Sequence, residues 1–227
     1  DTIKGISGYS SNTTGAAVGI DNANIVEDGI LGLSLNYGSS SIESEGSSLA
    51  KSDITNYGVN FYGNYEFDTN VFLNAQVGFS FNDINKERPN AGGASYIAKA
   101  NYGSTQFSSK VAVGVDIFPV NGLTITPVVS LAQTMVDTEG YTEKGANTGF
   151  NMTVSSHKES MLRSGIKVDA SVKMMDVMGT IIKPSMKVGY FYDITNDPVA
   201  TVSNFEASST SFATTGPEGD PSTYLIG

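Results

Sequence analysis

One stretch, from Asp53 to Phe81, constrains the fold of this chain more than any other. In its first arm, Asp53–Phe67, apolar side chains occupy alternate positions, and polar residues and glycines occupy the positions between them. A turn at Asp68–Asn70 leads into a second arm with the same alternation. Successive side chains of a strand point to opposite faces, so each arm has one apolar and one polar face. Both arms exceed the usual length of about five or six residues and match the roughly nine to eleven of a membrane-crossing strand.

The same pattern recurs along the chain. It predicts further strands at Thr14–Ile20, Ile30–Ser39, Tyr96–Phe118, Leu123–Leu131, His157–Val172, Thr180–Asp193, Phe205–Thr215 and Thr223–Gly227. Short connections alternate with longer polar segments, which are predicted as loops at Ser40–Ser52, Asn85–Ser95, Asp137–Gly149 and Thr195–Asn204. Outer-membrane barrels have short periplasmic turns and longer external loops. The sequence therefore predicts an all-β, antiparallel transmembrane barrel of a Gram-negative outer membrane, with the longer loops at the cell surface.

Composition excludes several other classes. The mean hydropathy is -0.10, and no apolar run approaches the roughly 18 residues that a membrane-spanning helix needs. The net charge of -10 argues against nucleic acid as a partner, because no basic patch could neutralise phosphates. The absence of cysteine rules out disulfides and thiolate metal sites. No phosphate-binding loop or metal-ligand spacing occurs, so neither a cofactor nor a metal is expected.

A soluble β-sandwich or barrel, with the apolar parity facing inward, is the alternative fold. Strand length, the loop alternation and the collection of charges on one parity weigh against it. Pro127 also weighs against an ordinary soluble sheet, because proline cannot donate to the hydrogen-bond ladder and requires a bulge.

The polar parity is the predicted wall of a water-filled lumen, where charges are tolerated. On the lipid side a lysine or arginine would cost roughly 2–4 kcal/mol at mid-membrane. The predicted pore-lining residues are Asn60, Tyr62, Asn64, Glu66, Lys110, Asp116, Arg163, Lys167, Asp169, Lys183 and Lys187. Opposite charges among them are expected to pair across the lumen, and Arg163 is expected to support such a network.

The apolar parity is the predicted lipid-facing surface. Aromatic girdles are expected at the external and periplasmic rims, as in other outer-membrane barrels. The membrane-facing aromatics are predicted to be Tyr37, Tyr57, Phe61, Tyr65, Phe79, Phe81, Phe107, Tyr190 and Tyr192.

His157, the single histidine of the chain, raises the alternative of an enzyme at the external rim. Such a site would pair His157 with Ser155 or Ser156 as nucleophile and with Asp137 as the orienting carboxylate. Serine is abundant in this chain and nothing in the sequence fixes that geometry, so an ordinary polar residue at a strand end is favoured. The prediction is therefore that the chain is no enzyme, with a porin-like barrel or a rim hydrolase as the alternative.

Several motifs, in this order over most of the chain, resemble the translocator domain of type V secretion autotransporters. The opening stretch Gly8–Asp21 is similar to the first motif of the family, and Asn56–Phe67 to its Tyr-Gly…Tyr-Gly-x-Tyr strand. Asn121–Leu131 resembles the Gly-Leu-x-Leu-Thr-Pro signature, which accounts for Pro127. Gly140–Ala146 and Met161–Asp169 are similar to two later motifs, although Gly165 comes one residue early in the second. The opening is most similar to rickettsial surface-antigen autotransporters.

This resemblance implies a monomeric twelve-stranded barrel that anchors an N-terminal passenger and exports it to the cell surface. It also implies contact with outer-membrane lipids and insertion by the barrel assembly machinery. Residues 1–227 are expected to form one autotransporter β-barrel domain. Compared with the family pattern, the pore-plugging helix and first strand are expected to be missing or to survive only as Asp1–Ser7, and the last strand is expected to be missing.

Overall fold

The computed structural model describes residues 8–23, 27–45, 50–67, 69–93, 95–175, 181–195, 198–216 and 219–227. The expected helix remnant at Asp1–Ser7 and Asp68 of the predicted turn lie outside these residues. The long strands are β1 (Tyr9–Asn22), β2 (Gly29–Ser44), β3 (Lys51–Glu66), β4 (Val71–Pro89), β5 (Ile97–Val115), β7 (Leu123–Thr138), β10 (His157–Val172) and β13 (Ser185–Asp193). The short strands are β6 (Ile117–Val120), β8 (Tyr141–Thr142), β9 (Met152–Val154), β11 (Met174–Met175), β12 (Ile181–Ile182), β14 (Ala200–Phe205), β15 (Ser211–Thr215) and β16 (Ser222–Ile226).

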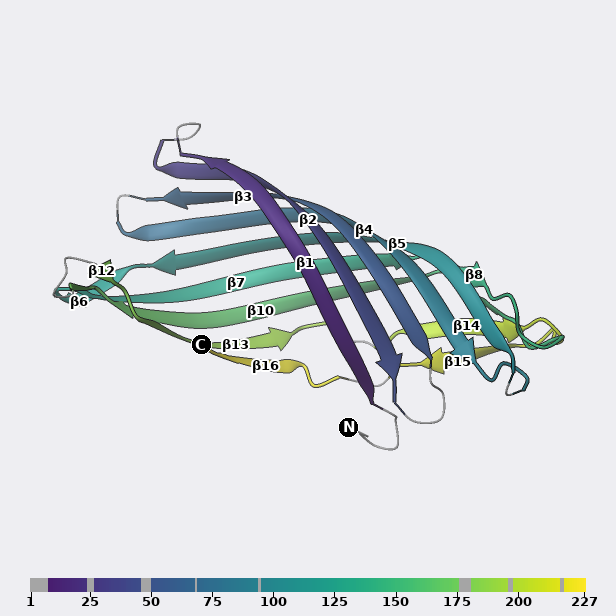
Figure 1. Cartoon of the computed structure of the whole chain (residues 1–227). Coiled ribbons are helices and arrows are strands. Elements are labelled where there is room, and N and C mark those ends of the chain that lie inside the picture. The colour runs from purple at the N-terminus through teal and green to yellow at the C-terminus, as the bar shows by residue number, and fades with distance from the viewer. Residues whose placement is uncertain are drawn as a thin grey trace.

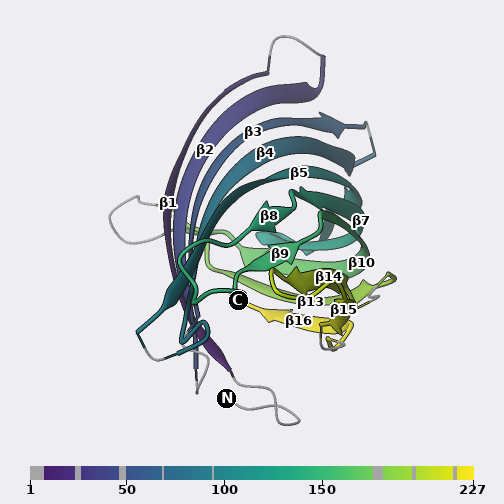
Figure 2. The same ribbon diagram turned by 90° about the vertical axis from the view of Figure 1, so that its right-hand side faces the viewer.

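One antiparallel ten-stranded sheet forms most of the molecule, in the order β1-β2-β3-β4-β5-β7-β10-β13-β16, with β6 pairing beside β7. The sheet is long and strongly curved, so it has a convex and a concave face (Figures 1 and 2). In the described part of the chain, β1 and β16 are its two edges and the sheet is not closed. A twelve-stranded closed barrel remains an implication of the family resemblance.

The central hairpin is confirmed. Strands β3 and β4 pair from Glu66↔Phe72 to Lys51↔Glu87 without a register shift. Because the pairing is continuous, the alternating apolar and polar side chains of both strands lie on opposite faces of the sheet. Large apolar side chains of the convex face are exposed, as in Val129 at 62% and Phe81 at 60%. Among the described residues no large side chain is fully buried, so this sheet has no soluble-type core.

The predicted loops are partly wrong, because strands continue into them. Strand β4 runs to Pro89, and β14 starts at Ala200 inside a predicted loop. The predicted strand Phe205–Thr215 is instead the end of a hairpin, β14–β15. These extensions consist mostly of polar and charged residues. A polar strand in water carries no apolar alternation, so its periodic signal vanishes although its backbone still pairs.

The extension of β4 pairs with β5 in the main sheet, whereas β14 belongs to a second, four-stranded sheet in the order β15-β14-β9-β8. It lies at one end of the curved sheet (Figure 1), and viewed from that end it sits within the outline of the curve (Figure 2). We call this sheet, together with the tips of β4 and β5 from Asn85 to Tyr102, the cap. The opposite end of the main sheet, where β6 and β12 lie, is called the turn end.

The predicted long strand Tyr96–Phe118 is interrupted at Asp116, which lies between β5 and β6. Thr126 donates a side-chain hydrogen bond to the Asp116 carboxylate. Strand β5 pairs with β7 only as far as Gly114↔Val128, and β6 takes over at Ile117↔Ile125. Pro127, which cannot donate a ladder hydrogen bond, occupies the gap. The bulge expected at Pro127 is wrong, because the register of Gly114↔Val128 continues unchanged at Ile117↔Ile125. The ladder is interrupted at Pro127 without an extra residue, and the register shift lies between Ile117 and Val120.

Candidate functional site

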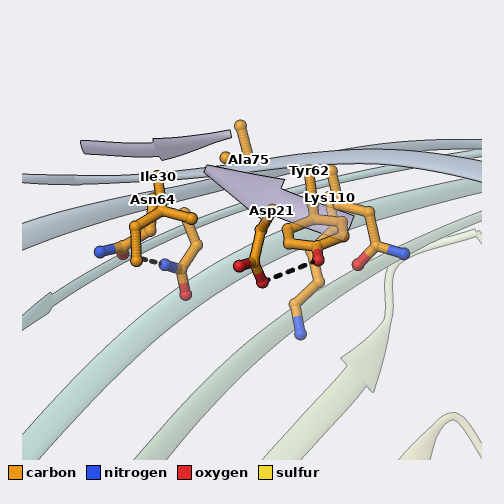
Figure 3. Close-up of a pocket in the computed structure, with 9 residues that line it drawn as sticks. Asp21, Ile30, Tyr62, Asn64, Ala75 and Lys110 are labelled. Carbon is orange, nitrogen blue, oxygen red and sulfur yellow. Dashed lines mark hydrogen bonds between the residues drawn. The ribbon is translucent and has the colours of Figure 1, made fainter. Parts of the chain in front are cut away.

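The concave face gathers most of the residues predicted to line a pore. In register, the polar positions of neighbouring strands lie opposite one another, as in Gln76↔Lys110 and Asp169↔Lys187. Figure 3 shows Asp21, Tyr62 and Lys110 pointing to one side of the sheet and Ala75 lying on the other. The predicted residues that share this face are Asn60, Tyr62, Asn64, Glu66, Lys110, Arg163, Lys167, Asp169 and Lys187.

Two of the predicted pore-lining residues, Lys183 and Asp116, lie outside regular strands. Lys183 precedes β13 and lines a hollow of about 780 Å³ at the turn end, together with Lys173 and Phe118. The predicted strand Thr180–Asp193 is divided into β12 and β13, with a break at Lys183–Pro184, and Thr180 lies outside the described residues. Asp116 sits at the interruption between β5 and β6. Both residues thus lie near the turn end and not along a regular strand wall.

An amide ladder crosses the concave face from β2 to β5. Asn60 Nδ2 donates to Asn36 Oδ1 at 3.0 Å, and Asn36 Nδ2 donates to Asn56 Oδ1 at 3.0 Å. Asn56 Nδ2 donates to Asn82 Oδ1 at 2.7 Å, and Asn82 Nδ2 donates to Ser104 Oγ at 2.9 Å. Asn36, Asn56 and Asn82 each both donate and accept, so the ladder itself is polar but carries no charge. Sequence reasoning identified Asn60 and missed its partners, because their alignment depends on register.

Charges gather on the opposite part of the concave face, on β10 and β13. Arg163 binds Asp193 through two hydrogen bonds, Nε to Oδ1 at 2.5 Å and Nη2 to Oδ2 at 2.9 Å, and Asp193 is only 8% exposed. Lys167 Nζ lies 2.6 Å from Asp169 Oδ2. These two pairs join neighbours on the concave face. Pairing across the lumen, which the sequence led us to expect, is not seen among the described residues.

A hollow of about 350 Å³ lies on the concave face beside Lys110. Asp21 and Tyr62 also line it, and the Tyr62 hydroxyl donates to Asp21 Oδ2 at 3.2 Å (Figure 3). No ion pair of Lys110 occurs within the described ranges. The hollow thus combines an amide-rich wall with one acidic and one basic side chain.

Aromatic rings of the concave face lie flat against glycines of the next strand. A Cβ atom on Gly32 would stand 2.2 Å from the Tyr62 ring, and one on Gly165 would stand 2.4 Å from the Phe191 ring. The same arrangement joins Phe72 to Gly114. Glycine is required where another group approaches the backbone so closely. The rings therefore cover the backbone without projecting far into the concave space. Phe72 and Phe191 were not predicted as site residues, and the glycine opposite each ring is visible only with the register known.

The predicted membrane-facing aromatics all lie on the convex face. The Tyr37 and Tyr57 rings are 5.4 Å apart, and the Phe79 and Phe107 rings 5.2 Å apart. Most are half exposed, with Phe61 at 54%. The full set on this face is Tyr37, Tyr57, Phe61, Tyr65, Phe79, Phe81, Phe107, Tyr190 and Tyr192.

Charged side chains on the convex face of the main-sheet strands are confined to the cap side. They are Glu43, Lys51, Asp53, Asp83, Glu87, Lys99, Asp137 and Lys158. Several pair with one another, such as Lys99 with Glu87 at 2.6 Å. Between these positions and the turn end, the convex face of the described strands carries no charge, as a lipid-facing surface requires.

The cap holds the most buried ion pair of the described residues. Arg88 donates from Nε to Glu143 Oε1 at 3.1 Å and from Nη2 to Oε2 at 2.5 Å, and Glu143 is 3% exposed. The Met152 amide also donates to Glu143 Oε2, at 3.0 Å. Because it hydrogen-bonds this carboxylate, Arg88 has a pKa above its usual value. These contacts tie the tip of β4 to the segment between β8 and β9.

Two stacked tyrosines add a second contact inside the cap. The rings of Tyr102 and Tyr141 are 4.2 Å apart and nearly parallel, and Lys86 Nζ donates to the Tyr141 hydroxyl at 3.0 Å. Burial raises the pKa of Tyr102 to about 12, with a smaller contribution from Tyr141. The Tyr102 hydroxyl therefore stays protonated in neutral conditions.

Replacing Glu143 with Gln should loosen the cap and leave the main sheet intact. The change removes the negative charge that binds Arg88. The loss of this charged hydrogen bond should lower the stability of the cap by about 1.5–3 kcal/mol. Limited proteolysis with mass-spectrometric mapping should detect faster cleavage between Ala91 and Phe150. Glu27→Gln, at an exposed position of the turn end, is the matched control. Equal cleavage rates in the two variants would contradict the assigned role of the ion pair.

The structure does not assemble the alternative catalytic site at His157. His157 Nε2 lies 3.3 Å from Glu159 Oε1, and Nδ1 has no hydrogen-bond partner. Asp137 instead pairs with Lys158 at 2.7 Å, on the face of the sheet opposite to His157. Among the described residues no hydrogen bond joins His157 to Ser155 or Ser156. The carboxylate expected to orient the histidine is therefore on the wrong face.

Comparison with known proteins decides the family. The model of the autotransporter beta-domain matches residues 1–227. The chain belongs to the autotransporter β-domain family. Outer membrane protein B of Rickettsia rickettsii is 25% identical over 84% of this chain and 12% of its own length. Outer membrane protein A of the same organism is 24% identical over 77% of this chain and 8% of its own length. The chain thus spans about one tenth of the curated relatives it matches.

Solved structures show the same fold. The translocator domain of the autotransporter NalP from Neisseria meningitidis superposes with a TM-score of 0.72 at 14% identity, over 96% of this chain and 79% of that one. The beta domain of the Bordetella autotransporter BrkA gives 0.66 at 12% identity, over 96% and 88%. These findings confirm the predicted family, the all-β fold and the Gram-negative outer-membrane location. As an autotransporter β-domain, the chain is a translocator that exports a passenger, and such domains are not enzymes themselves.

Proposed function

We propose that the concave face is the wall along which the N-terminal passenger of this protein passes, and that the convex face contacts outer-membrane lipid. The observation that supports the proposal is the separation of the two faces. The concave face carries the amide ladder and the Arg163–Asp193 pair, and the convex face has an uncharged apolar band. A polypeptide in transit needs a wet wall that forms no strong apolar contacts, and lipid needs the opposite surface.

Cysteine crosslinking tests this arrangement, because the chain has no cysteine of its own. Single cysteines are placed in the full-length protein at Gln76, on the concave face, or at Val77, on the convex face. Export is then stalled with a folded domain fused to a passenger that carries one cysteine. A disulfide to the passenger should form from position 76 and not from position 77. Crosslinking from position 77 alone would contradict the proposal.

The cellular setting follows from this assignment. The cap end faces the cell exterior and the turn end the periplasm, since longer connections lie outside in outer-membrane barrels. The barrel is inserted by the barrel assembly machinery and works as a monomer around its own passenger. Residues 1–227 act as one translocator domain. Depletion of the assembly machinery should leave the chain protease-sensitive in the periplasm, and normal insertion without it would contradict this step.

No catalytic role is assigned to the β-domain itself. His157 pairs with Glu159, and its expected carboxylate partner lies on the other face of the sheet. A rim hydrolase would lose ester hydrolysis on changing His157 to Ala. Detection of such an activity in the purified wild-type domain, and its loss in that variant, would restore the enzymatic alternative.

A further inference from the structure

The hollow of about 780 Å³ at the turn end is lined by two lysines. Lys173 follows β10 and Lys183 precedes β13. The rest of the lining is residues 118–124, which include most of β6, the turn after it and the start of β7 (Figure 1). No carboxylate occurs among the described residues that line the hollow, so the lining has a net positive charge.

Both lysines are available to a ligand. Lys173 and Lys183 are exposed, and neither forms an ion pair within the described ranges. Asp116, which immediately precedes β6, accepts a hydrogen bond from Thr126 and does not line the hollow. An ammonium group has three N–H donors and no acceptor. Two such groups without a carboxylate partner therefore suit a negatively charged group that has several acceptor oxygens.

An exposed apolar row borders this hollow. Val120, Leu123 and Val172 lie opposite one another on β6, β7 and β10. The row belongs to the convex face, because Leu123 shares the parity of Val129 on β7. Val120 is 61% exposed and Val172 is 40% exposed. Lys173 directly follows Val172, so the cations stand where the uncharged convex band ends.

Lysine is suited to such a boundary. Its long stem can lie along apolar surface while its charged head stays in the polar layer. In the proposed orientation, the turn end meets the headgroups of the periplasmic leaflet. The hollow therefore combines two cations with an apolar row at the depth where a phospholipid has its phosphate.

We infer that this hollow binds an anionic phospholipid of the periplasmic leaflet, with the phosphate at Lys173 and Lys183 and an acyl chain along Val120. The inference rests on the proposed function, in which the convex face contacts lipid and the turn end faces the periplasm. Charge complementarity favours this occupant, because basic pockets at a membrane boundary bind anionic lipid headgroups. An acidic segment of the passenger would match the two lysines but not the exposed apolar row, whereas a phospholipid matches both.

Native mass spectrometry of the full-length protein in detergent, with added phosphatidylglycerol, tests the site. Lys173→Gln and Lys183→Gln should each lower the affinity about fivefold, which corresponds to about 1 kcal/mol for a lysine near anionic lipid. Lys183→Arg should bind like the wild type, because it keeps the cation. Lys144→Gln makes the same change in net charge at an exposed position of the cap and should leave binding unchanged.

Further probes separate the lipid from its parts. Diacylglycerol, which has the acyl chains but no phosphate, should bind more weakly than phosphatidylglycerol and should not respond to the lysine variants. Glycerol phosphate in excess, which has no acyl chain, should not displace phosphatidylglycerol. Val120→Gln should lower phosphatidylglycerol affinity about threefold, because it removes part of the apolar contact with the acyl chain.

Equal phosphatidylglycerol binding by the wild type and both lysine-to-glutamine variants would overturn the inference. So would an equal loss in Lys144→Gln, because binding would then follow overall charge. Displacement by glycerol phosphate would show an anion site without a lipid. Reduced passenger display with unchanged lipid binding would assign the two lysines to the passenger instead.

Because Lys173, Lys183 and Val120 are exposed, their variants should fold, which heat-modifiable gel migration verifies. The path of the passenger is tested separately by crosslinking at positions 76 and 77. Failure of the lipid experiment therefore leaves the proposed function standing.

Discussion

Replacing Arg163 with Leu should destabilise the folded domain by about 3–5 kcal/mol, because it leaves a buried charge without its partner. Asp193 is only 8% exposed and receives both of its strong hydrogen bonds from Arg163. The leucine offers no donor, so Asp193 must either remain charged and unpaired or take up a proton. Urea unfolding in detergent, followed by the change in gel migration of the folded domain, should show the midpoint shifted to lower urea. In the full-length protein, less passenger should reach the cell surface.

The double variant Arg163→Leu with Asp193→Asn separates the charge from the packing. Removing both charges avoids the unpaired carboxylate, so the double variant should recover most of the lost stability. Lys110→Leu, which breaks no ion pair of the described residues, serves as the control for losing one concave-face cation. If Arg163→Leu and Lys110→Leu proved equally stable, the Arg163–Asp193 pair would have no special structural role.

Replacing Val77 with Arg should cost about 2–4 kcal/mol, because it places a guanidinium on the lipid-facing surface. Val77 lies within the uncharged convex band and is 37% exposed. Folding yield into lipid vesicles, measured against urea concentration, should fall sharply for this variant. The effect should be weaker in short-chain detergent, where water reaches the surface more easily.

The adjacent residue provides a matched control on the same strand. Gln76→Arg adds the same side chain on the concave face, within the hollow that contains Asp21. Water and a nearby carboxylate are available there, although Lys110 lies directly opposite, so the stability should fall by no more than about 1 kcal/mol. A larger loss from Gln76→Arg than from Val77→Arg would reverse the assignment of the two faces.

The sequence predicted the parts of the fold that depend on apolar alternation. The hairpin of β3 and β4 and the main strands from β1 to β13 follow from side chains that alternate between lipid and water. The family motif accounted for the presence of Pro127, but the bulge expected there is absent. An ion pair of Arg163 was expected across the lumen, whereas its partner Asp193 lies on the next strand, because such a partner is fixed by register and not by spacing.

The cap could not be predicted, because its strands lack the signal on which the other strands depend. Strand β14 and its neighbours lie among polar residues, so hydropathy does not distinguish them from a loop. The contact of Arg88 with Glu143 joins segments that no local pattern relates. The glycines beneath Tyr62 and Phe191 were likewise visible in the sequence, but their purpose requires the cross-strand partner to be known.

The contacts of the cap join segments that are far apart in the sequence, which affects the order in which the domain folds. Arg88 and Glu143 are separated by 55 residues, whereas β3 and β4 are joined by a short connection. Contacts between distant segments form more slowly than hairpins, because a larger loop must close first. The main sheet should therefore form before the Arg88–Glu143 contact of the cap. The cap is therefore expected to be the last part of the described structure to form.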